Sequence, residues 1–177
     1  MNPRRGESLS FDRLAGQYKI GLAARIARTG VLPMKPLPHQ YEARLDGGSD
    51  GYATVASAGL PDLRVAPPAD FDGPGDAWSP EHLLLASVEA CFMMTLRAIA
   101  RASKFSFLAL EMDSEGTVDR KDGATRFIAI VLRPRMTVAA GTDRDKALRL
   151  MEKSEKACLI SASLNFAVRL EPEVLVG

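Results

Sequence analysis

The sequence predicts an α+β fold in which strand-like segments surround two principal helices. Three observations support this class. A long apolar helical segment runs from Pro80 to Ala102, segments of alternating apolar and polar residues lie on both sides of it, and Asp122-Gly123 separates two of those segments. Asp-Gly between two alternating runs is a strong hairpin signal. We therefore expect a strand-rich domain with hairpins before and after a central helix.

Length and composition indicate one soluble globular domain. The 177 residues are 46% hydrophobic, 25% charged and only 6% aromatic, so aliphatic residues and Met must form the core. The net charge of +1 gives no general attraction to nucleic acid or to an anionic membrane, and neither is expected as a partner. Two cysteines and two histidines exclude a Cys-x-x-Cys zinc site and a disulfide framework. Without a secretory signal pattern, we expect a cytoplasmic protein with reduced cysteines.

Residues 1–36 form a basic N-terminal extension of the domain at 37–177. Seven Lys or Arg against two acids give the extension a charge of +5, whereas the other 16 basic and 20 acidic residues give −4. A helix with one apolar stripe is predicted here by the i, i+4 spacing of Leu14, Tyr18, Leu22 and Ile26. Two interpretations stay open: a basic arm for a partner, a membrane surface or organelle import, or a helix packed on the same or a neighbouring subunit.

The segment after the extension predicts a first small sheet. Tyr41 to Leu45 and Tyr52 to Ala58 look like strands, and a turn-rich loop joins them. Leu63 to Ala66 is expected as a third short strand. Residues 67–76, rich in Pro, Gly and Asp, then form an exposed connection within the same domain.

The central helix is expected over Pro80 to Ala102. Ser79 is the predicted N-cap, and Pro80 suits the first helical position because its missing N–H has no partner there. The interior is apolar on nearly all sides, and Glu89 and Arg97 interrupt it. A membrane span needs about 20 apolar residues without such charges. A single small domain can hardly surround this helix, so we expect a homodimer in which each subunit covers the other's helix.

The second half of the chain predicts a hairpin, a helix and a strand. Leu108 to Met112 and Arg126 to Met136 are the strand-like flanks of the Asp-Gly turn. Thr142 is the expected N-cap of the second helix. An inward stripe on that helix comprises Ala147, Leu150, Met151, Ser154 and Cys158. The last strand is expected from Asn165 to Glu171.

Cys91 and Cys158 are the residues that could carry chemistry. A cysteine on an apolar helix face is most often a small buried hydrophobe. Both cysteines lie on inward helical faces, and a pair of this kind in a reducing compartment also fits an attacking and a resolving thiol. Their separation of 67 residues does not decide between these interpretations, because helices can bring distant residues together.

Two motifs resemble the OsmC/Ohr family, the osmotically inducible and organic-hydroperoxide-resistance proteins. The first is Pro80-Glu81 at the start of an apolar helix with Ala-Cys-Phe at 90–92, so that Glu81 precedes Cys91 by ten residues. The second surrounds Cys158 and ends at Ser161, although Leu159 stands where the family typically has Pro. The resemblance covers roughly residues 41–171.

The resemblance implies an OsmC-like fold and a thiol peroxidase. The fold is an intertwined homodimer in which antiparallel β-sheets wrap around central helices. Cys91 would be the peroxidatic thiolate and become a sulfenic acid. Cys158 would condense with it to a disulfide, which a small dithiol would reduce. Neither a metal nor a bound organic cofactor is implied, and an apolar lining would favour organic hydroperoxides as substrates.

Glu81 would be the third catalytic residue implied by the resemblance. Ten residues of straight helix span about 15 Å, so Glu81 cannot reach Cys91 of its own chain. If Glu81 serves the site, either the helix begins later than predicted or Glu81 serves Cys91 of the other subunit, and a site shared between two subunits is the simpler arrangement. Glu81 is otherwise a first-turn acid favoured by the helix dipole.

One residue of the family pattern is missing. The peroxidases place an Arg beside the Gly-rich turn of the first hairpin, where it stabilises the thiolate, and Ser49 occupies that place here. Cys91 is in mid-helix, so the N-terminus of its own helix does not lower its pKa. Arg44 and Arg64, on nearby predicted strands, are the candidate substitutes.

Three functions therefore stay open. The leading hypothesis is an organic hydroperoxide reductase that uses Cys91 and Cys158. The second is a non-enzymatic OsmC-like protein that binds an apolar ligand or senses thiol oxidation. The third, a thiol hydrolase or transferase, would need a general base, and His39 and His82 both look like surface residues.

Overall fold

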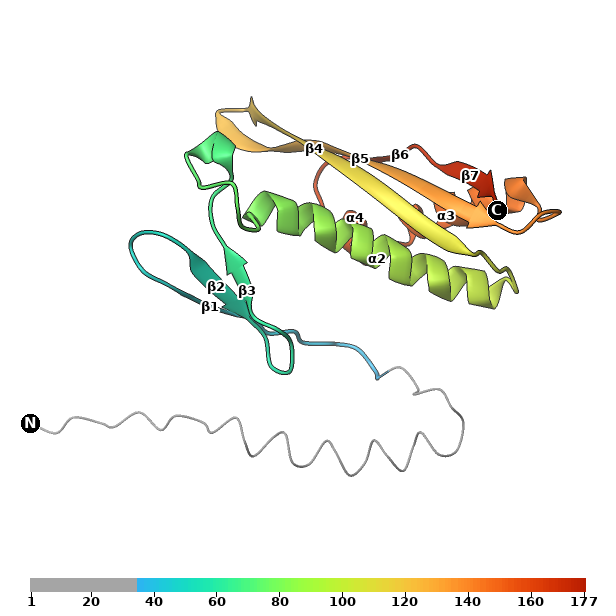
Figure 1. Ribbon diagram of the computed structural model, residues 1–177, viewed down its shortest axis with the longest axis horizontal. Helices are drawn as coiled ribbons and strands as arrows, with labels where there is room; N and C mark the ends of the chain where they lie inside the picture. Colours follow the sequence, from blue (N-terminus) through green and yellow to red (C-terminus); the bar gives the residue numbers. More distant parts are fainter. Residues whose placement is uncertain (1–34) are drawn as a thin grey trace, which may run out of the picture. The chain divides into compact units, whose positions relative to one another are not determined.

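The computed structural model describes residues 35–177, and residues 43–177 form one compact unit (Figure 1). The helix predicted around Leu14 to Ile26 lies outside the described residues, so the division at residue 36 stays a prediction. Two sheets and three α-helices follow in the order in which the sequence predicts the principal elements.

The first sheet is antiparallel and has three short strands. It contains β1 (Arg44–Gly47), β2 (Ala53–Ala56) and β3 (Leu63–Val65) in that order. This confirms the predicted hairpin and third strand, but β1 begins three residues later than predicted and includes Asp46 and Gly47 of the predicted loop. A connection with one short 3-10 helix (Ala69–Phe71) then leads to the central helix, and the N–H of Ala66 donates to the Trp78 carbonyl at 3.0 Å.

The central helix α2 (Pro80–Ala102) has the predicted bounds and the predicted N-cap. The Ser79 hydroxyl accepts a hydrogen bond from the His82 N–H at 3.3 Å and contacts His82 Nδ1 at 3.0 Å. Ser79 is fully buried, so its side chain satisfies groups that water does not reach. The residues buried on α2 follow one stripe: Val88, Phe92, Leu96 and Ala100.

The second sheet is built on a long hairpin. β4 (Ala109–Lys121) and β5 (Ala124–Val138) pair antiparallel, and Asp122 and Gly123 form the turn with φ values of 53° and 79°. Positive φ at both positions is the geometry that an Asp-Gly turn favours. The hairpin predicted from the sequence is therefore confirmed.

Two short strands complete this sheet and make it mixed rather than antiparallel throughout. β6 (Val168–Leu170) and β7 (Glu173–Val176) both pair parallel with β5. β5 is fifteen residues long, so one of its edges has room for both. The sequence analysis predicted a strand around β6 and missed β7, because four residues after Pro172 carry too little alternation to identify a strand.

The core lies between the second sheet and two helices. α2 and α3 (Arg144–Lys156) pack against each other, and buried residues of both helices share one core with those of β5. β5 contributes Ile130, Leu132, Met136 and Val138, all with no exposed surface. The predicted inward stripe of α3 is confirmed for its four residues within the helix, which are buried.

Two expectations about α3 are wrong. Its N-cap is Asp143, not Thr142, and an Asp143 carboxylate oxygen accepts from the Lys146 N–H at 2.8 Å. Asp is a somewhat better cap than Thr, which explains the shift by one residue. Cys158 is not part of α3, which ends at Lys156; it is the N-cap of the short helix α4 (Leu159–Ala162).

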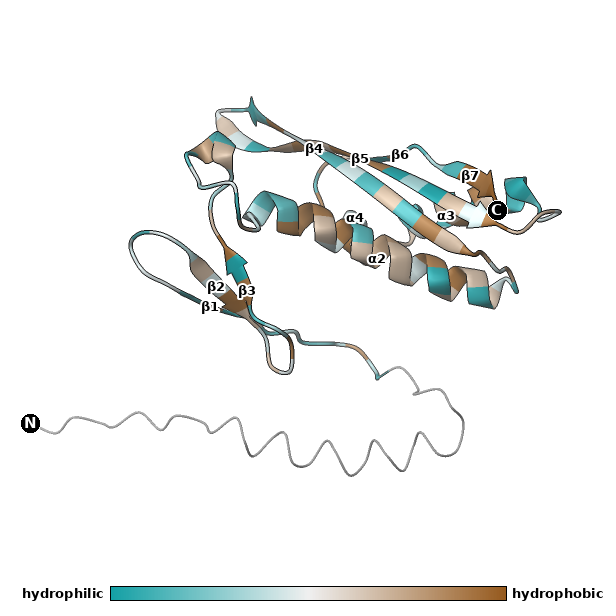
Figure 2. Ribbon diagram, viewed as in Figure 1, coloured by the Kyte–Doolittle hydropathy of each residue, from teal (hydrophilic) through white to brown (hydrophobic). Residues whose placement is uncertain are grey.

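α2 is long and apolar enough to cross a membrane by length and composition alone. Figure 2 shows the mostly apolar colouring of the helix, with interruptions. One such helix is weak evidence of a membrane span, because the core helix of a soluble protein passes the same test. Only 22% of its apolar window is fully buried, and most of the other residues of α2 are half-buried or exposed in the single chain.

Candidate active site

The packing of α2 on α4 brings the two cysteines together. Cys91 lies in the middle of α2, Cys158 precedes α4, and each thiol affects the pKa of the other. Both are free thiols. Cys158 has no exposed surface, whereas Cys91 is partly exposed. An outside reactant therefore reaches Cys91 first.

Uncharged hydrogen-bond donors surround the sulfur of Cys91. Burial raises the pKa of Cys91, but donors outweigh it: the backbone N–H of Ile160, the Cys158 thiol, the Thr95 hydroxyl and the backbone N–H of Leu159. The pKa of Cys91 is therefore lowered overall. The first turn of α4 supplies the helix N-terminus that α2 cannot offer to a mid-helix residue.

The acidity of Cys158 changes in the opposite direction. Burial raises its pKa, and the nearby Cys91 adds to that rise through a hydrogen bond and through charge repulsion. The hydroxyl and N–H of Ser161 lower the pKa of Cys158, but by less. The opposite directions make Cys91 the more acidic thiol of the pair and Cys158 the less acidic one.

Glu81 lies at the first turn of α2, ten residues before Cys91. Because α2 is helical over that whole interval, the two residues are separated by about 15 Å of helix axis. One carboxylate oxygen of Glu81 is buried and has no hydrogen-bond partner within residues 35–177. A buried carboxylate oxygen without a partner is costly, so a hydrogen-bond donor that reached this position would be favourable.

Glu81 is among the residues that line an apolar pocket of about 380 Å³. The small sheet and the connection after it line the pocket, mainly through Leu45, Ala53, Val65 and Phe71. Glu81 is the one charged residue in the lining. The pocket can therefore hold an apolar body and offer it a hydrogen-bond acceptor.

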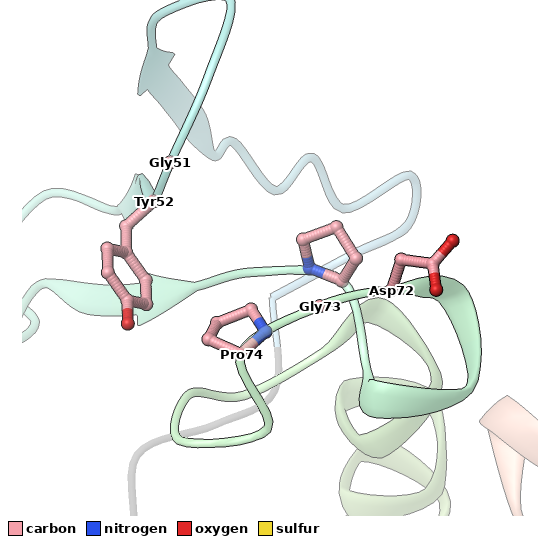
Figure 3. Close-up of a pocket in the computed structure, with 6 residues that line it drawn as sticks. Gly51, Tyr52, Asp72, Gly73 and Pro74 are labelled. Atoms are coloured by element: carbon pink, nitrogen blue, oxygen red, sulfur yellow. The ribbon is translucent and has the colours of Figure 1, made fainter.

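A second hollow of about 440 Å³ lies beside this pocket at the surface (Figure 3). Tyr52 lines it, and its hydroxyl donates to Asp76 at 2.8 Å. Gly73 allows the loop to fold closely, since an added Cβ would lie 1.8 Å from the Pro67 carbonyl oxygen. Neither cysteine lines this hollow, so we do not assign it chemistry.

The two candidate arginines have other partners within the chain. Arg44 forms an ion pair with Asp46 on β1. Arg64 donates to the Asp76 carbonyl at 2.9 Å and lies 4.2 Å from the centre of the Tyr52 ring. Ser49, at the turn where the family resemblance expects an arginine, donates to the Asp50 carboxylate at 2.9 Å.

The remaining titratable candidates have structural roles. Glu89 accepts a hydrogen bond from the Ser114 hydroxyl at 2.5 Å, and Arg97 is exposed. His82 contacts the Ser79 cap, and His39 is exposed and contacts the Lys35 carbonyl. Within residues 35–177, no cluster of three or more His, Cys, Asp or Glu could hold a metal ion.

Comparison with known proteins identifies the family. The model of the OsmC family, described as OsmC-like protein, matches residues 73–173. The chain belongs to the OsmC-like family. This confirms the family and the α+β class that the sequence analysis expected.

Among its OsmC-like relatives, protein YmaD of Bacillus subtilis, which is uncharacterized, is 30% identical over 78% of this chain and 96% of its own length. The organic hydroperoxide resistance protein of Xanthomonas axonopodis pv. citri is 28% identical over 66% of this chain and 80% of its own length. A crystal structure from Legionella pneumophila, named as an organic hydroperoxide resistance protein OsmC, has 26% identity and a TM-score of 0.63. It matches 80% of this chain and 100% of that one.

Several donors in this OsmC-like site were not found from the sequence. Thr95 follows Cys91 by four residues, and that spacing on one helix face could have identified it. The N–H groups of Leu159 and Ile160 carry no side-chain signal, because any residue supplies them. Their position depends on the two-residue gap between α3 and α4, which places Cys158 at a helix start.

Proposed function

We propose that this protein is a thiol-dependent peroxidase that reduces organic hydroperoxides, with Cys91 as the attacking thiol and Cys158 as the resolving thiol. One observation carries the proposal: the two thiols affect each other's acidity, and their pKa values are moved in opposite directions. A peroxidatic cysteine must be a thiolate, and a resolving cysteine must lie within reach of it. The names of the organic hydroperoxide resistance relatives support the same substrate class.

In the first step, the Cys91 thiolate attacks the distal oxygen of the hydroperoxide. The O–O bond breaks, the electron pair of that bond goes to the proximal oxygen, and a proton converts it to an alcohol. Cys91 becomes a sulfenic acid. The donors from Ile160, Thr95 and Cys158 favour the thiolate that starts this step.

In the second step, the Cys158 sulfur attacks the Cys91 sulfenic acid. An S–S bond forms, the S–O bond breaks, and water leaves with the Cys158 proton. The packing of α2 on α4 places the two thiols near enough to affect each other's pKa, which favours this step. A small dithiol then reduces the disulfide and is itself oxidised to a disulfide. Neither a metal nor an organic cofactor takes part in these steps.

The substrate pocket is proposed to be complete only in a homodimer. The pocket at Glu81 is separated from Cys91 of the same chain by ten residues of helix. A partner subunit that covers the exposed apolar faces of α2 could bring its own Cys91 to this pocket. The apolar lining would then hold the organic part of the hydroperoxide, and Glu81 would face its polar end.

The test is a peroxide-consumption assay with cumene hydroperoxide, hydrogen peroxide and a lipoyl-type dithiol. We expect turnover with a preference for the organic hydroperoxide, and loss of turnover in Cys91→Ser. Cys158→Ser should lose dithiol-supported turnover but still react once with peroxide. No consumption by the wild type, with both thiols still reduced, would contradict the peroxidase.

The alternative is a non-enzymatic OsmC-like protein that binds an apolar ligand or senses thiol oxidation. The unpartnered oxygen of Glu81, which lines an apolar pocket, favours it, because the arginine that the family resemblance pairs with this acid is absent. Ligand binding without peroxide turnover, measured with an environment-sensitive apolar dye and abolished by Ala53→Trp in the pocket, would support this alternative. Arg120→Trp in the exposed hairpin is the control.

A further inference from the structure

Ser161 carries a buried hydroxyl that has no hydrogen-bond partner within the described residues. Two other serines in this region behave differently. Ser154 and Ser163 each donate to the carbonyl four residues earlier, at 2.6 and 2.8 Å. A hydroxyl in a helix usually satisfies itself in this way, so the free hydroxyl of Ser161 requires another explanation.

The sulfur of Cys158 is the group that Ser161 can serve. Cys158 is the N-cap of α4 and Ser161 is its third residue, and these two positions face each other at a helix start. As a thiol, Cys158 makes no capping hydrogen bond. The hydroxyl and the N–H of Ser161 nevertheless both favour the Cys158 thiolate over the thiol. These donors are therefore in place for a negative charge on Cys158, which the resting pair does not have.

We propose that the Ser161 hydroxyl stabilises Cys158 as the leaving thiolate when a dithiol reduces the Cys91–Cys158 disulfide. This inference depends on the proposed peroxidase cycle, because that cycle forms the disulfide. It gives Ser161 a role in recycling, and it leaves the attack on peroxide to the donors around Cys91.

The difference in exposure between the two cysteines determines which sulfur of the disulfide the dithiol attacks. A thiolate of the dithiol attacks Cys91, which is partly exposed, and not Cys158, which has no exposed surface. The new bond joins the dithiol to Cys91, the Cys91–Cys158 bond breaks, and its electron pair goes to Cys158. The second thiol of the reductant then releases the Cys91 thiolate and closes its own disulfide. A better-stabilised leaving thiolate speeds the first of these steps.

The experiment measures reduction of the disulfide by dithiothreitol in Ser161→Ala, with Ser163→Ala as the matched control on the same helix end. We expect the second-order rate constant to fall about three- to tenfold in Ser161→Ala, less than a full hydrogen bond to a charged group is worth, because the leaving sulfur carries only part of its charge in the transition state. Ser163→Ala should match the wild type. In a Cys91→Ser background, Ser161→Ala should also raise the pKa of Cys158, read from alkylation against pH.

A second pair of variants keeps the test valid if Ser161→Ala does not fold. Thr and Val have the same shape, so Ser161→Thr should keep the fast reduction and Ser161→Val should lose it. Equal rates in that pair, or an unchanged pKa of Cys158, would overturn the proposal. A mixed disulfide of a monothiol found on Cys158 instead of Cys91 would overturn the assigned direction.

Failure of this inference can be separated from failure of the peroxidase. The disulfide can be formed with diamide instead of a hydroperoxide, and its reduction can then be measured in the same way. If peroxide does not oxidise the protein but the diamide-formed disulfide still shows the Ser161 effect, only the peroxidase is wrong. If peroxide works and the effect is absent, only the role of Ser161 is wrong.

Discussion

Cys91 and Cys158 affect each other's acidity in opposite directions: Cys158 lowers the pKa of Cys91, and Cys91 raises the pKa of Cys158. Cys91 belongs to a helix that begins at Pro80, and Cys158 precedes a helix that begins at Leu159. The two thiols therefore differ in acidity in the resting protein, before any substrate binds. Cys91 can be the nucleophile, because it is the more acidic thiol of the pair.

Oxidation should link these two residues within one chain. Stoichiometric cumene hydroperoxide is expected to produce a Cys91–Cys158 disulfide, which peptide mass analysis under non-reducing conditions detects. Cys158→Ser should leave a sulfenic acid on Cys91, trapped by dimedone, because no resolving thiol is present. Cys91→Ser is the control and should leave Cys158 reduced. Two reduced thiols in folded wild-type protein under excess peroxide would rule the disulfide out.

Removal of the Thr95 hydroxyl should make Cys91 less reactive at neutral pH. That hydroxyl is one of the donors that lower the pKa of Cys91, so Thr95→Val should raise this pKa by about half to one unit. A higher pKa leaves less thiolate at pH 7, and alkylation by iodoacetamide should slow by about three- to tenfold. Thr95→Ser keeps a hydroxyl and should stay near the wild type.

The pH dependence of Cys91 alkylation follows from the lowered pKa of this thiol. Below the pKa of Cys91, the thiolate fraction and the alkylation rate fall about tenfold for each pH unit. Because the pKa of Cys91 is lowered, the midpoint in the wild type should lie below the ordinary thiol value of about 8.5. Thr95→Val should move this midpoint to higher pH. A midpoint at the same pH in both proteins would contradict a role for the hydroxyl.

The N-cap of α2 should make a measurable contribution to stability. Ser79 is fully buried and accepts from the His82 N–H, so Ser79→Ala leaves a donor unsatisfied. We expect a loss of about 1–2 kcal/mol in the free energy of unfolding in urea. Ser163→Ala, at an exposed serine, should cost clearly less. A loss no larger than that of Ser163→Ala would mean that the cap is unimportant.

The elements with strong local signals could be predicted from the sequence. Ser79 followed by Pro80 fixes the start of α2, because an N-cap and a residue without N–H suit only that end. Asp122-Gly123 fixes the long hairpin, because few other pairs accept two positive φ angles. Both signals come from residues adjacent in sequence, and the structure confirms both.

The parts that depend on distant contacts could not be predicted. β7 forms because it pairs with β5, and its own four residues carry little alternation of apolar and polar side chains. The place of Cys158 as the first residue before α4, rather than the last on α3, depends on how the chain turns after Lys156. The backbone donors at Cys91 follow from that turn, so the sequence motif indicated the two thiols but not what lowers the pKa of Cys91.

The exposed apolar faces of α2 should be covered by a second subunit. Light scattering at micromolar concentration is expected to give about twice the mass of one chain. Met94 is 55% exposed in the single chain, so Met94→Lys should place a charge in the interface and weaken the dimer. Val118→Lys, at an exposed apolar residue of the β4–β5 hairpin, is the control. A stable wild-type monomer would also remove the basis for a site shared between subunits.

Ser49→Arg should restore the arginine that the family pattern places in the first hairpin. Ser49 brings no positive charge, and one Glu81 carboxylate oxygen is buried without a partner. An arginine that reaches this oxygen and the Cys91 of the partner subunit should lower the pKa of Cys91 below its wild-type value. Peroxide reduction at pH 7 should then rise if thiolate supply limits the rate.

The control for this variant is Ser49→Gln, which has a long side chain without charge and should leave the pKa of Cys91 unchanged. The measurement is alkylation of Cys91 against pH, with Cys158 replaced by Ser in every protein. Each unit by which the pKa falls corresponds to about 1.4 kcal/mol of thiolate stabilisation. In Glu81→Gln, the added arginine loses its ion-pair partner, so its effect on Cys91 should become smaller. The same pKa in Ser49→Arg and Ser49→Gln would show that the hairpin turn does not reach the thiol, and that the donors from α4 and Thr95 are the groups that set its acidity.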